Sequence, residues 1–509
     1  MLEQCEKVLG EKDFLAGARK GQIVPLIVKV KSCQVSLPLL LSLLGHNQPV
    51  CLLDSAGGSS QLTEYSFLGT SPLVIFRYKN SKAQIIEKDK SYYLSGNPFR
   101  LLRDLLQRLT PQIKLNLPIP FWGGAMGYLS YDAGRYIEKL PNWAQDDLLL
   151  PELYFFFPEI LLILDHMNGD AYVVINQLVE SDAKTALSAA GEKMDKVCSY
   201  LSKAVEKNSQ AGKEPYQSNL QASNKTAASS NTTQPEFEKM VERIKEYIRA
   251  GDVYQVNISQ RLEVPHNDDS LALYLKLRKV NPSPFASYLN CGDFQLVSSS
   301  PERLIMLRDG VAQTRPIAGT RRRGEDYGED NKLSDDLILD EKERAEHIML
   351  VDLERNDLGR VCQYGSVQVN ELMVLEKYSH VIHIVSNIEG KLHGNKDQFD
   401  LVRALFPGGT ITGCPKVRCM EIIEELEPVR RGPYTGSIGY FGFNGNMDMN
   451  IIIRTYVVKD NRVFMQVGAG IVIDSKPARE YFETLSKADA LLVAVGCSKE
   501  VMKWEKLLT

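Results

Sequence analysis

Two pairs of glutamates have the spacing of a metal site. Glu343 and Glu346 stand three residues apart in the segment 334–361, which has a helical pattern, so their side chains share one face. Glu480 and Glu483 repeat this arrangement in a second predicted helix. One such pair is ordinarily part of a solvated helix surface. Two pairs that converge would repel each other unless a cation lay between them, and hard oxygen ligands suit magnesium. The sequence therefore predicts Mg²⁺ bridging the protein to an anionic ligand.

Glycine-rich segments separate the two pairs. They are FPGGTITGCPK (406–416), YTGSIGYFGFNGNMD (434–448) and QVGAGIV (466–472). Glycine lets the backbone approach a ligand closely and direct N–H groups at an anion. A nucleotide loop is disfavoured, because a GxGxxG loop needs a strand before it and a helix after it, whereas 432–445 has the pattern of strand and turn. These segments favour a small anionic substrate.

The N-terminal part has the pattern of an antiparallel sheet with packed helices. Short β-rich runs at 72–78, 83–88 and 159–166 are separated by Gly, Asn and Pro, and 98–109 has a helical pattern. The nine cysteines include no CxxC pair, and the closest two are Cys414 and Cys419. Reduced thiols are therefore expected.

A helix and a strand are predicted after the middle of the chain. Phe237, Val241, Ile244 and Ile248 form one helical stripe, and Gly251 follows as the expected C-terminal cap. The strand-like run YQVNISQRLEV comes next. These elements begin the part of the chain that contains the glutamate pairs.

A polar segment divides the chain. Residues 204–234 are rich in Ser, Asn, Gln, Thr and Ala and have no apolar periodicity, which is typical of a linker or exposed loop. The expected organisation is an N-terminal region (1–203), this linker (204–234), a catalytic region (235–492) and a tail (493–509).

Composition excludes several classes of partner. The net charge is -4, and 44% of the residues are hydrophobic, so nucleic acid and anionic lipid are not expected partners. The charged N-terminal stretch is unlike a signal peptide, and the longest apolar runs are too short to span a bilayer. We expect a cytoplasmic protein.

Ordered sequence strings carry a family resemblance. The chain resembles the chorismate-utilising enzymes, specifically component I of anthranilate synthase and of aminodeoxychorismate synthase. The N-terminal region matches more loosely than the catalytic region. The strings that carry the resemblance are GDVYQVNISQR (251–261), NPSPFASYL (281–289), SSSPERL (298–304), TRPIAGTRRRG (314–324), EKERAEHIMLVDLERNDLGRV (341–361), EKYSHVIHIVSN (376–387), FPGGTITGCPKVRCMEIIEELEP (406–428), GPYTGSIGY (432–440), IIIRT (451–455) and GAGIVIDS (468–475).

The resemblance implies a fold and a metal site. The implied fold is α+β, a large two-layered sandwich of antiparallel sheets flanked by helices. Glu346 and Glu483 would hold Mg²⁺, and Glu343 and Glu480 would support it through water.

The resemblance also assigns the substrate contacts. Arg454 and Tyr434 would bind one carboxylate of chorismate, which agrees with the need of a dianion for a cationic fork. Glu302 would be the acid that protonates the departing C4 hydroxyl. Alternatives from the residues alone are a core histidine at 383 and an ion pair of Arg454 with a structural Asp. The remaining implied contacts are Lys487 and the backbone of Gly468, Ala469 and Gly470 at the substrate, with His383 and Thr412 along the reacting ring.

Two positions bear on the reaction. Gln255 stands where water-using members of the family have lysine, so ammonia is favoured as the nucleophile. Ala318 stands where many aminodeoxychorismate synthases have a nucleophilic lysine, and alanine forms no covalent adduct. Ala318 therefore favours anthranilate synthase.

Other strings favour amination at C4. QVNIS, PSPFASYL, FPGGTITG and GSIGY resemble aminodeoxychorismate synthases, including forms without the lysine, so we favour that activity, with anthranilate synthase as the alternative. No GxCxG glutaminase motif is present, so a separate glutamine amidotransferase subunit is the expected partner. A non-catalytic, chorismate-binding paralogue is the competing class of function.

The N-terminal region suggests a regulatory site. CLLDSA (51–56) resembles the family string that holds tryptophan, which makes Ser55 the candidate contact. Glu64 replaces the basic residue usual before Tyr-Ser, and this argues against regulation by tryptophan.

Overall fold

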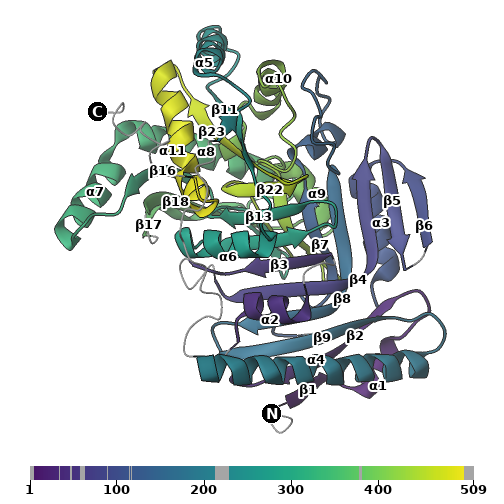
Figure 1. The fold of residues 1–509 in the computed structure, drawn as a ribbon. Coiled ribbons are helices and arrows are strands. Elements are labelled where there is room, and N and C mark those ends of the chain that lie inside the picture. The colour runs from purple at the N-terminus through teal and green to yellow at the C-terminus, as the bar shows by residue number, and fades with distance from the viewer. Residues whose placement is uncertain are drawn as a thin grey trace.

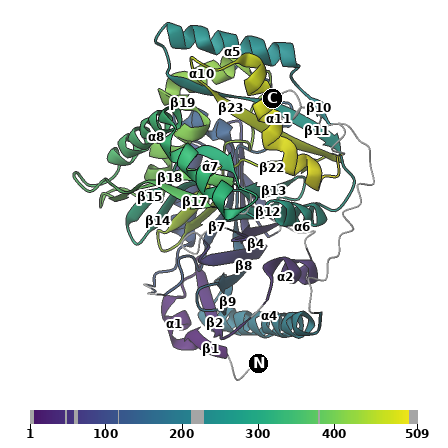
Figure 2. The same cartoon turned by 90° about the vertical axis from the view of Figure 1, so that its left-hand side faces the viewer.

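The strands form one branched antiparallel system. The computed structural model describes residues 5–33, 35–45, 49–57, 63–88, 90–113, 115, 117–211, 228–377 and 381–497. Within them, 23 strands are connected by hydrogen bonds, and every pair of named strands is antiparallel. Figures 1 and 2 show two sheets that rise from a common base. The predicted α+β class with antiparallel sheets is confirmed.

The base consists of N-terminal strands. They pair in the order β1, β2, β9, β8, β4, β5, β6, and helix α4 lies beneath β2 and β9 (Figure 1). Their bounds are β1 (Cys5–Leu9), β2 (Ile23–Val30), β9 (Asp170–Leu178), β8 (Leu153–Asp165), β4 (Tyr65–Lys79), β5 (Lys82–Glu87) and β6 (Lys90–Ser95).

The first branch leaves the base at β4. Its strands pair in sequence from β3 to β11, and β10 and β19 both pair with β11. They are β3 (Val50–Asp54), β12 (Phe285–Asn290), β13 (Gln295–Ser300), β22 (Thr455–Lys459), β23 (Arg462–Ile471), β11 (Gln255–Pro265), β10 (Ser229–Ser230) and β19 (Gly413–Cys414).

The second branch leaves the base at β8. Its strands pair in sequence from β7 to β18, and β16 and β17 both pair with β18. They are β7 (Gly124–Leu129), β20 (Ser437–Gly442), β21 (Met447–Asn450), β14 (Arg303–Arg308), β15 (Val311–Thr314), β18 (Val381–Lys391), β16 (Ile317–Arg322) and β17 (Gln368–Lys377).

Both branches join the N-terminal and catalytic regions. β3 pairs with β12, and β7 pairs with β20, so neither sheet is completed within one region. In the first branch, Leu52, Tyr288, Val297 and Tyr456 face one another in register on four adjacent strands and are fully buried. The two regions therefore share one hydrophobic core.

Helices cover the outer faces of the sheets. In Figure 1, α5, α10 and α11 lie at the top near β11 and β23, and α3 lies beside β5. The helices are α1 (Glu11–Gly17), α2 (Leu37–Leu44), α3 (Pro98–Leu109), α4 (Ala183–Ala211), α5 (Gln234–Arg249), α6 (Ser270–Val280), α7 (Tyr327–Leu339), α8 (Glu341–Gly359), α9 (Gln398–Leu405), α10 (Lys416–Leu426) and α11 (Pro477–Ala494), with 3₁₀ turns η2 (Tyr131–Tyr136) and η3 (Gly409–Ile411).

Helix α5 follows the predicted stripe. Phe237, Val241 and Ile244 are buried, and Ile248 packs partly buried against the same cluster. The helix ends just before Gly251, whose φ of 79° is a left-handed conformation that glycine adopts without strain.

The single helix predicted over 334–361 is wrong. Helices α7 and α8 meet at Asp340, which has an extended backbone with φ -66° and ψ 110°. Its carboxylate accepts hydrogen bonds from the backbone amides of Lys342 and Glu343, so it caps the start of α8. Arg321 also binds this carboxylate at 3.0 Å. Because Asp340 is extended and caps the amides that follow it, α8 begins as a separate helix.

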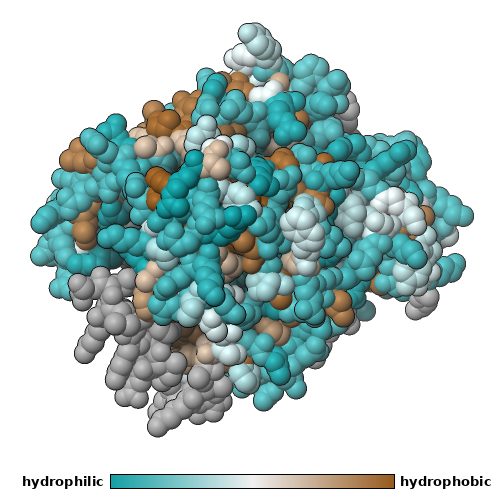
Figure 3. All heavy atoms as spheres, turned by 90° about the horizontal axis from the view of Figure 1, so that it is seen from above, coloured by the Kyte–Doolittle hydropathy of each residue, from teal (hydrophilic) through white to brown (hydrophobic). Residues whose placement is uncertain are grey.

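Helices and a strand reach into both ends of the segment 204–234 that the sequence suggests as a linker. Helix α4 continues to Ala211, and β10 and the start of α5 lie within 204–234, while 212–227 lie outside the described residues. The predicted tail begins inside α11, and 498–509 also lie outside them. No helix in the described ranges is long and apolar enough to cross a bilayer. Viewed from above, the surface is mostly hydrophilic with small separated hydrophobic groups (Figure 3).

Candidate active site

The two glutamate pairs lie within electrostatic reach of each other. Burial raises the pKa of Glu346, and the negative charges of Glu343, Glu480 and Glu483 raise it further, while Lys342 opposes the shift. The Glu480 carboxyl is itself 8% exposed, and burial followed by the charge of Glu483 raises its pKa despite a hydrogen bond from Ser475. The carboxyl groups of α8 and α11 are therefore near enough for their charges to interact.

This donor set suits a hard divalent cation. Mutual repulsion and raised proton affinity indicate a site that gains stability when a cation enters. No three described Asp, Glu, His or Cys side chains lie close enough to ligate one ion together. Magnesium commonly uses one or two carboxylates and completes its shell with water and substrate. The carboxylates of α8 and α11 fit that mode.

A cavity of about 340 Å³ opens beside Glu483. His383, Arg454 and Lys487 also line it. The Lys487 Nζ lies 3.0 Å from a Glu483 carboxylate oxygen and donates to the Gly468 carbonyl at 3.0 Å. The cavity is therefore lined both by Glu483, which belongs to the predicted metal site, and by the cations Arg454 and Lys487.

Arg454 is a desolvated cation in a strained backbone. Its φ is 52°, a left-handed conformation that costs energy for any side chain with a Cβ. Burial lowers the pKa of the guanidinium, and in the described part of the chain no carboxylate offsets this effect. The alternative of an ion pair with a structural Asp is thus not seen. A buried cation on a cavity wall is suited to bind an anion.

Two glycines of β23 leave space for neighbouring polar groups. A Cβ at Gly468 would lie 2.7 Å from the Ile258 carbonyl and 2.8 Å from the Tyr434 hydroxyl. A Cβ at Gly470 would lie 2.5 Å from Nε2 of Gln255. Ala469 is fully buried and faces the opposite side of the strand. The spacing of the two glycines therefore reserves one face of β23 for polar groups.

Tyr434 and Gln255 present polar atoms on that face. Burial raises the pKa of Tyr434, so its phenol stays protonated. Oε1 of Gln255 is buried and has no hydrogen-bond partner among the described residues. An unsatisfied buried acceptor is costly unless a ligand or water supplies the donor.

His383 is held as a neutral ring. Burial lowers its pKa to about 4. Its Nδ1 lies 3.3 Å from the Gly319 carbonyl and 3.0 Å from the Thr320 hydroxyl. A carbonyl only accepts, so Nδ1 carries the hydrogen and Nε2 is the acceptor. The histidine packs in the apolar strand β18 and also reaches the cavity wall.

Glu302 is a buried acid with one unsatisfied oxygen. It is 6% exposed, and burial raises its pKa to about 7, partly offset by the Thr410 hydroxyl and then by the Ile317 backbone amide. Its Oε1 forms no hydrogen bond with any described residue. Such a carboxyl can carry a proton at neutral pH and release it to a bound substrate.

Most of the predicted site residues lie apart from the described lining of this cavity, and among them are Tyr434, Gly468, Ala469, Gly470, Glu343, Glu346 and Glu480. Glu302, Gln255 and Thr412 are not among its wall residues, although Pro301 is. The Thr412 hydroxyl donates to the Gly408 carbonyl at 2.8 Å, so it has a structural partner. Ala318 lies on β16 opposite Ile384, next to His383.

Sequence reasoning missed Glu354. This residue is 6% exposed on α8, and burial and the charge of Glu302 raise its pKa. The only signal in the sequence was its position seven residues after His347, on the same stripe of a helix.

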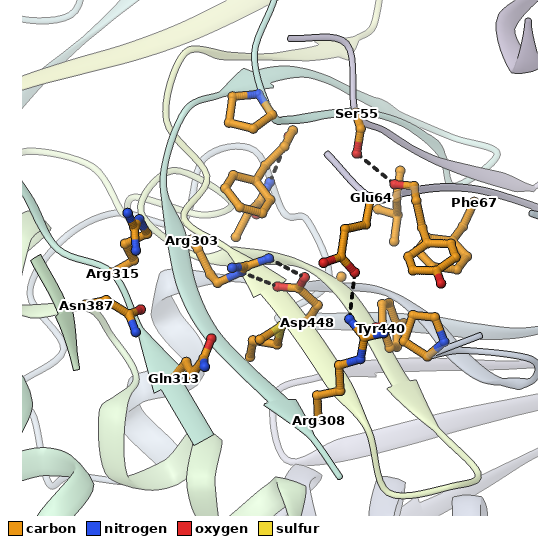
Figure 4. Close-up of a pocket in the computed structure, with 18 of the residues that line it drawn as sticks. Ser55, Glu64, Phe67, Arg303, Arg308, Gln313, Arg315, Asn387, Tyr440 and Asp448 are labelled. Carbon is orange, nitrogen blue, oxygen red and sulfur yellow. Dashed lines mark hydrogen bonds and ion pairs between the residues drawn. The ribbon is translucent and has the colours of Figure 1, made fainter. Parts of the chain in front are cut away.

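A larger cavity of about 680 Å³ lies elsewhere, between the two branches. Ser55, Phe67, Tyr440 and the ion pair of Glu64 with Arg308 line it (Figure 4). None of the predicted catalytic residues lines it. The predicted residues His383, Arg454, Glu483 and Lys487 line the smaller cavity instead.

Known proteins resemble this chain along most of its length. A family model described as chorismate binding enzyme matches residues 48–493. Anthranilate synthase component 1 of Acetivibrio thermocellus is 41% identical over 487 residues, covering 95% of this chain and 97% of that protein. Aminodeoxychorismate synthase component 1 of Bacillus subtilis is 44% identical over 454 residues, covering 89% and 93%.

A solved structure agrees with the fold. The crystal structure of anthranilate synthase component I from Streptococcus pneumoniae TIGR4 superposes with a TM-score of 0.73 at 31% identity, covering 84% of this chain and 92% of that one. Fold and sequence agree, and the chain belongs to the chorismate binding enzyme family.

Proposed function

We propose that this chain is component I of an aminodeoxychorismate synthase, which converts chorismate and ammonia to 4-amino-4-deoxychorismate for 4-aminobenzoate and folate synthesis. The observation that carries amination of chorismate is that Arg454 and Glu483 line one cavity, and that the charge of Glu483 also acts on Glu346 of α8. A dianionic substrate matches a desolvated cation on one side and a metal on the other.

Glu302 acts as the acid in this proposal. The C4 hydroxyl of chorismate needs a proton to leave as water, and Glu302 holds a proton near neutral pH. Neutral His383 contributes an acceptor nitrogen without adding a second cation. Tyr434 and Lys487 help Arg454 to hold the substrate carboxylate.

Magnesium is part of the proposal. Glu346 and Glu483 would hold the ion, with Glu343 and Glu480 supporting it through water. The bound ion would neutralise a substrate carboxylate and stabilise negative charge that develops there. The raised pKa values of Glu346 and Glu480 support a cation at this position.

The position of amination rests on sequence strings. QVNIS, FPGGTITG and GSIGY resemble aminodeoxychorismate synthases and so support a product with the nitrogen bonded to C4. The alternative is anthranilate synthase, in which chorismate and ammonia give anthranilate, pyruvate and water. Ala318 supports the alternative, because it supplies no nucleophile for a covalent intermediate.

Two binding partners complete the proposal. A separate glutamine amidotransferase subunit would deliver ammonia. Tryptophan would bind in the Ser55 cavity, whose aromatic side chains suit an indole. A tryptophan-dependent rise in melting temperature that is lost in Ser55→Phe would support this second site, and no rise at millimolar tryptophan would exclude it.

A coupled assay tests the activity. Purified protein is incubated with chorismate, Mg²⁺ and ammonium, with and without an added aminodeoxychorismate lyase. We expect 4-aminobenzoate only when the lyase is present. Fluorescent anthranilate without the lyase would establish the alternative. Chorismate binding without turnover would indicate a non-catalytic paralogue.

A further inference from the structure

Glu354 is a second buried carboxyl beside Glu302. It projects from the buried face of α8 and is 6% exposed. The charged groups that act on it are Glu302, Asp357 and Lys416. Lys416 is already engaged, because its Nζ lies 2.6 Å from Asp357 and donates to the Leu405 carbonyl at 2.7 Å. In the described part of the chain, Glu354 therefore has no cation of its own.

Hydrogen-bond geometry places a proton on Glu354. The Thr314 hydroxyl lies in hydrogen-bond contact with both the Leu304 carbonyl, at 2.9 Å, and the Glu354 carboxyl. A hydroxyl has only one hydrogen to donate, and a backbone carbonyl can only accept. Thr314 therefore donates to Leu304, and Glu354 donates to Thr314. All three groups are satisfied only when Glu354 is a carboxylic acid.

The hydrogen-bond chain ends at the segments that surround Glu302. Leu304 follows Glu302 by two residues at the start of β14. Thr314 precedes Ile317 by three residues, and the Ile317 amide binds the Glu302 carboxyl. Glu354 thus links α8 to both segments that fix the acid.

We propose that Glu354 is a positioning residue, a buried carboxylic acid that donates to Thr314 and so holds Glu302 in place for proton transfer. This inference rests on the proposed role of Glu302 as the acid. Burial raises the pKa of Glu354 to about 8, opposed by the Thr314 hydroxyl and supported by the charge of Glu302, and this value agrees with a proton at neutral pH. As pH rises, Glu302, with a pKa of about 7, loses its proton first, and its charge then helps to keep the proton on Glu354, because two adjacent carboxylates repel.

Infrared spectroscopy tests the proton directly. Spectra of the full chain and of Glu354→Gln are compared at about pH 6.5 and about pH 9.5. We expect the difference between the two proteins at the lower pH to contain the C=O stretch of a carboxylic acid, and at the higher pH a carboxylate band. A carboxylate band at both pH values would overturn the proposal.

Kinetics test the positioning role. Glu354→Gln keeps the shape and an N–H donor and is neutral like the protonated acid, so turnover at neutral pH stays within about 3-fold and the alkaline limb of kcat/KM, which reports Glu302, stays in place. Glu354→Met removes the donor, and we expect kcat to fall about 10- to 100-fold with little change in the KM for chorismate. Glu341→Met, at the exposed start of the same helix, is the matched control.

Thr314→Val is an independent second variant. It should reproduce the loss in Glu354→Met, and the double variant should lose no more than either one, because both break the same chain. Unchanged kcat in Glu354→Met, or additive losses, would overturn the proposal. If Glu302→Gln retained turnover, the acid in the proposed function would be wrong, whereas the infrared band would still report the proton on Glu354.

Discussion

Burial acts on the acid and on the cation of the site in opposite ways. Glu302 responds by holding its proton, whereas Arg454 remains a cation whose pKa is lowered by burial. The strained φ of 52° at Arg454 adds a further cost that packing alone does not explain. Perturbed groups of this kind concentrate at functional sites, so both residues are expected to contact the substrate.

The first prediction concerns pH. Glu302 must carry a proton to act as an acid, and its pKa is about 7, so kcat/KM for chorismate should fall as pH rises through that value. The measurement is a pH profile at constant free ammonia. Glu302→Gln should abolish turnover, and an unchanged alkaline limb in a variant that still turns over would remove Glu302 from this role.

The second prediction concerns substrate binding. Arg454→Gln should raise the KM for chorismate about 10- to 100-fold, since a charged hydrogen bond contributes about 1.5–3 kcal/mol. Arg462→Gln, which removes an exposed arginine from β23, serves as the control. Equal KM values in both variants would show that Arg454 does not hold the substrate.

The third prediction concerns the metal. Glu483→Gln should abolish activity with the fold intact and weaken Mg²⁺ binding more than about 10-fold, because even outer-shell partners contribute that much. Calorimetric titration with Mg²⁺ and circular dichroism provide the measurements. Glu242→Gln on the exposed face of α5 is the control. Near-normal turnover in Glu483→Gln would exclude it as a ligand.

Residue spacing predicted part of this site. The glutamate pairs were visible because residues three apart share a helix face. The sequence did not single out Glu354, because nothing in it shows that this side of α8 is buried and lies near Glu302. For the larger cavity, the string CLLDSA indicated only Ser55, because the other residues that line it come from strands far apart in the chain.

At the level of elements, local signals located helix α5 but not the bounds of α4, α7 and α8. The stripe and glycine of α5 were predicted correctly. The division between α7 and α8 was missed. Asp340 can cap α8 only because its own backbone is extended, and the sequence pattern does not show that conformation. Helix α4 likewise extends into the polar segment, where periodicity gave no signal.

The fourth prediction concerns β23. Gly468→Ala should lower activity about 10- to 100-fold, because its Cβ would displace the strand or the Tyr434 hydroxyl. Gly191→Ala in α4 is the contrasting variant, since its Cβ meets no atom within 4 Å. It should raise the free energy of unfolding by about 0.5–1 kcal/mol with normal activity. Wild-type activity in Gly468→Ala would show that β23 tolerates a side chain there.

At the level of the whole molecule, strand pairing across regions could not be predicted from composition. The polar segment suggested two separate regions, yet β3 pairs with β12 and β7 pairs with β20. Pairings between distant segments depend on which edges meet in space, and single strands do not encode their partners. The predicted fold class came from the family resemblance rather than from periodicity.

The central claim is that ammonia nitrogen becomes bonded to C4 of chorismate. Incubation with chorismate, Mg²⁺ and ¹⁵N-ammonium, followed by NMR of the unfractionated product, locates the label directly. We expect ¹⁵N coupling to C4 in a product that retains the enolpyruvyl group. Label at C2, with release of pyruvate, would contradict the claim and establish anthranilate synthesis.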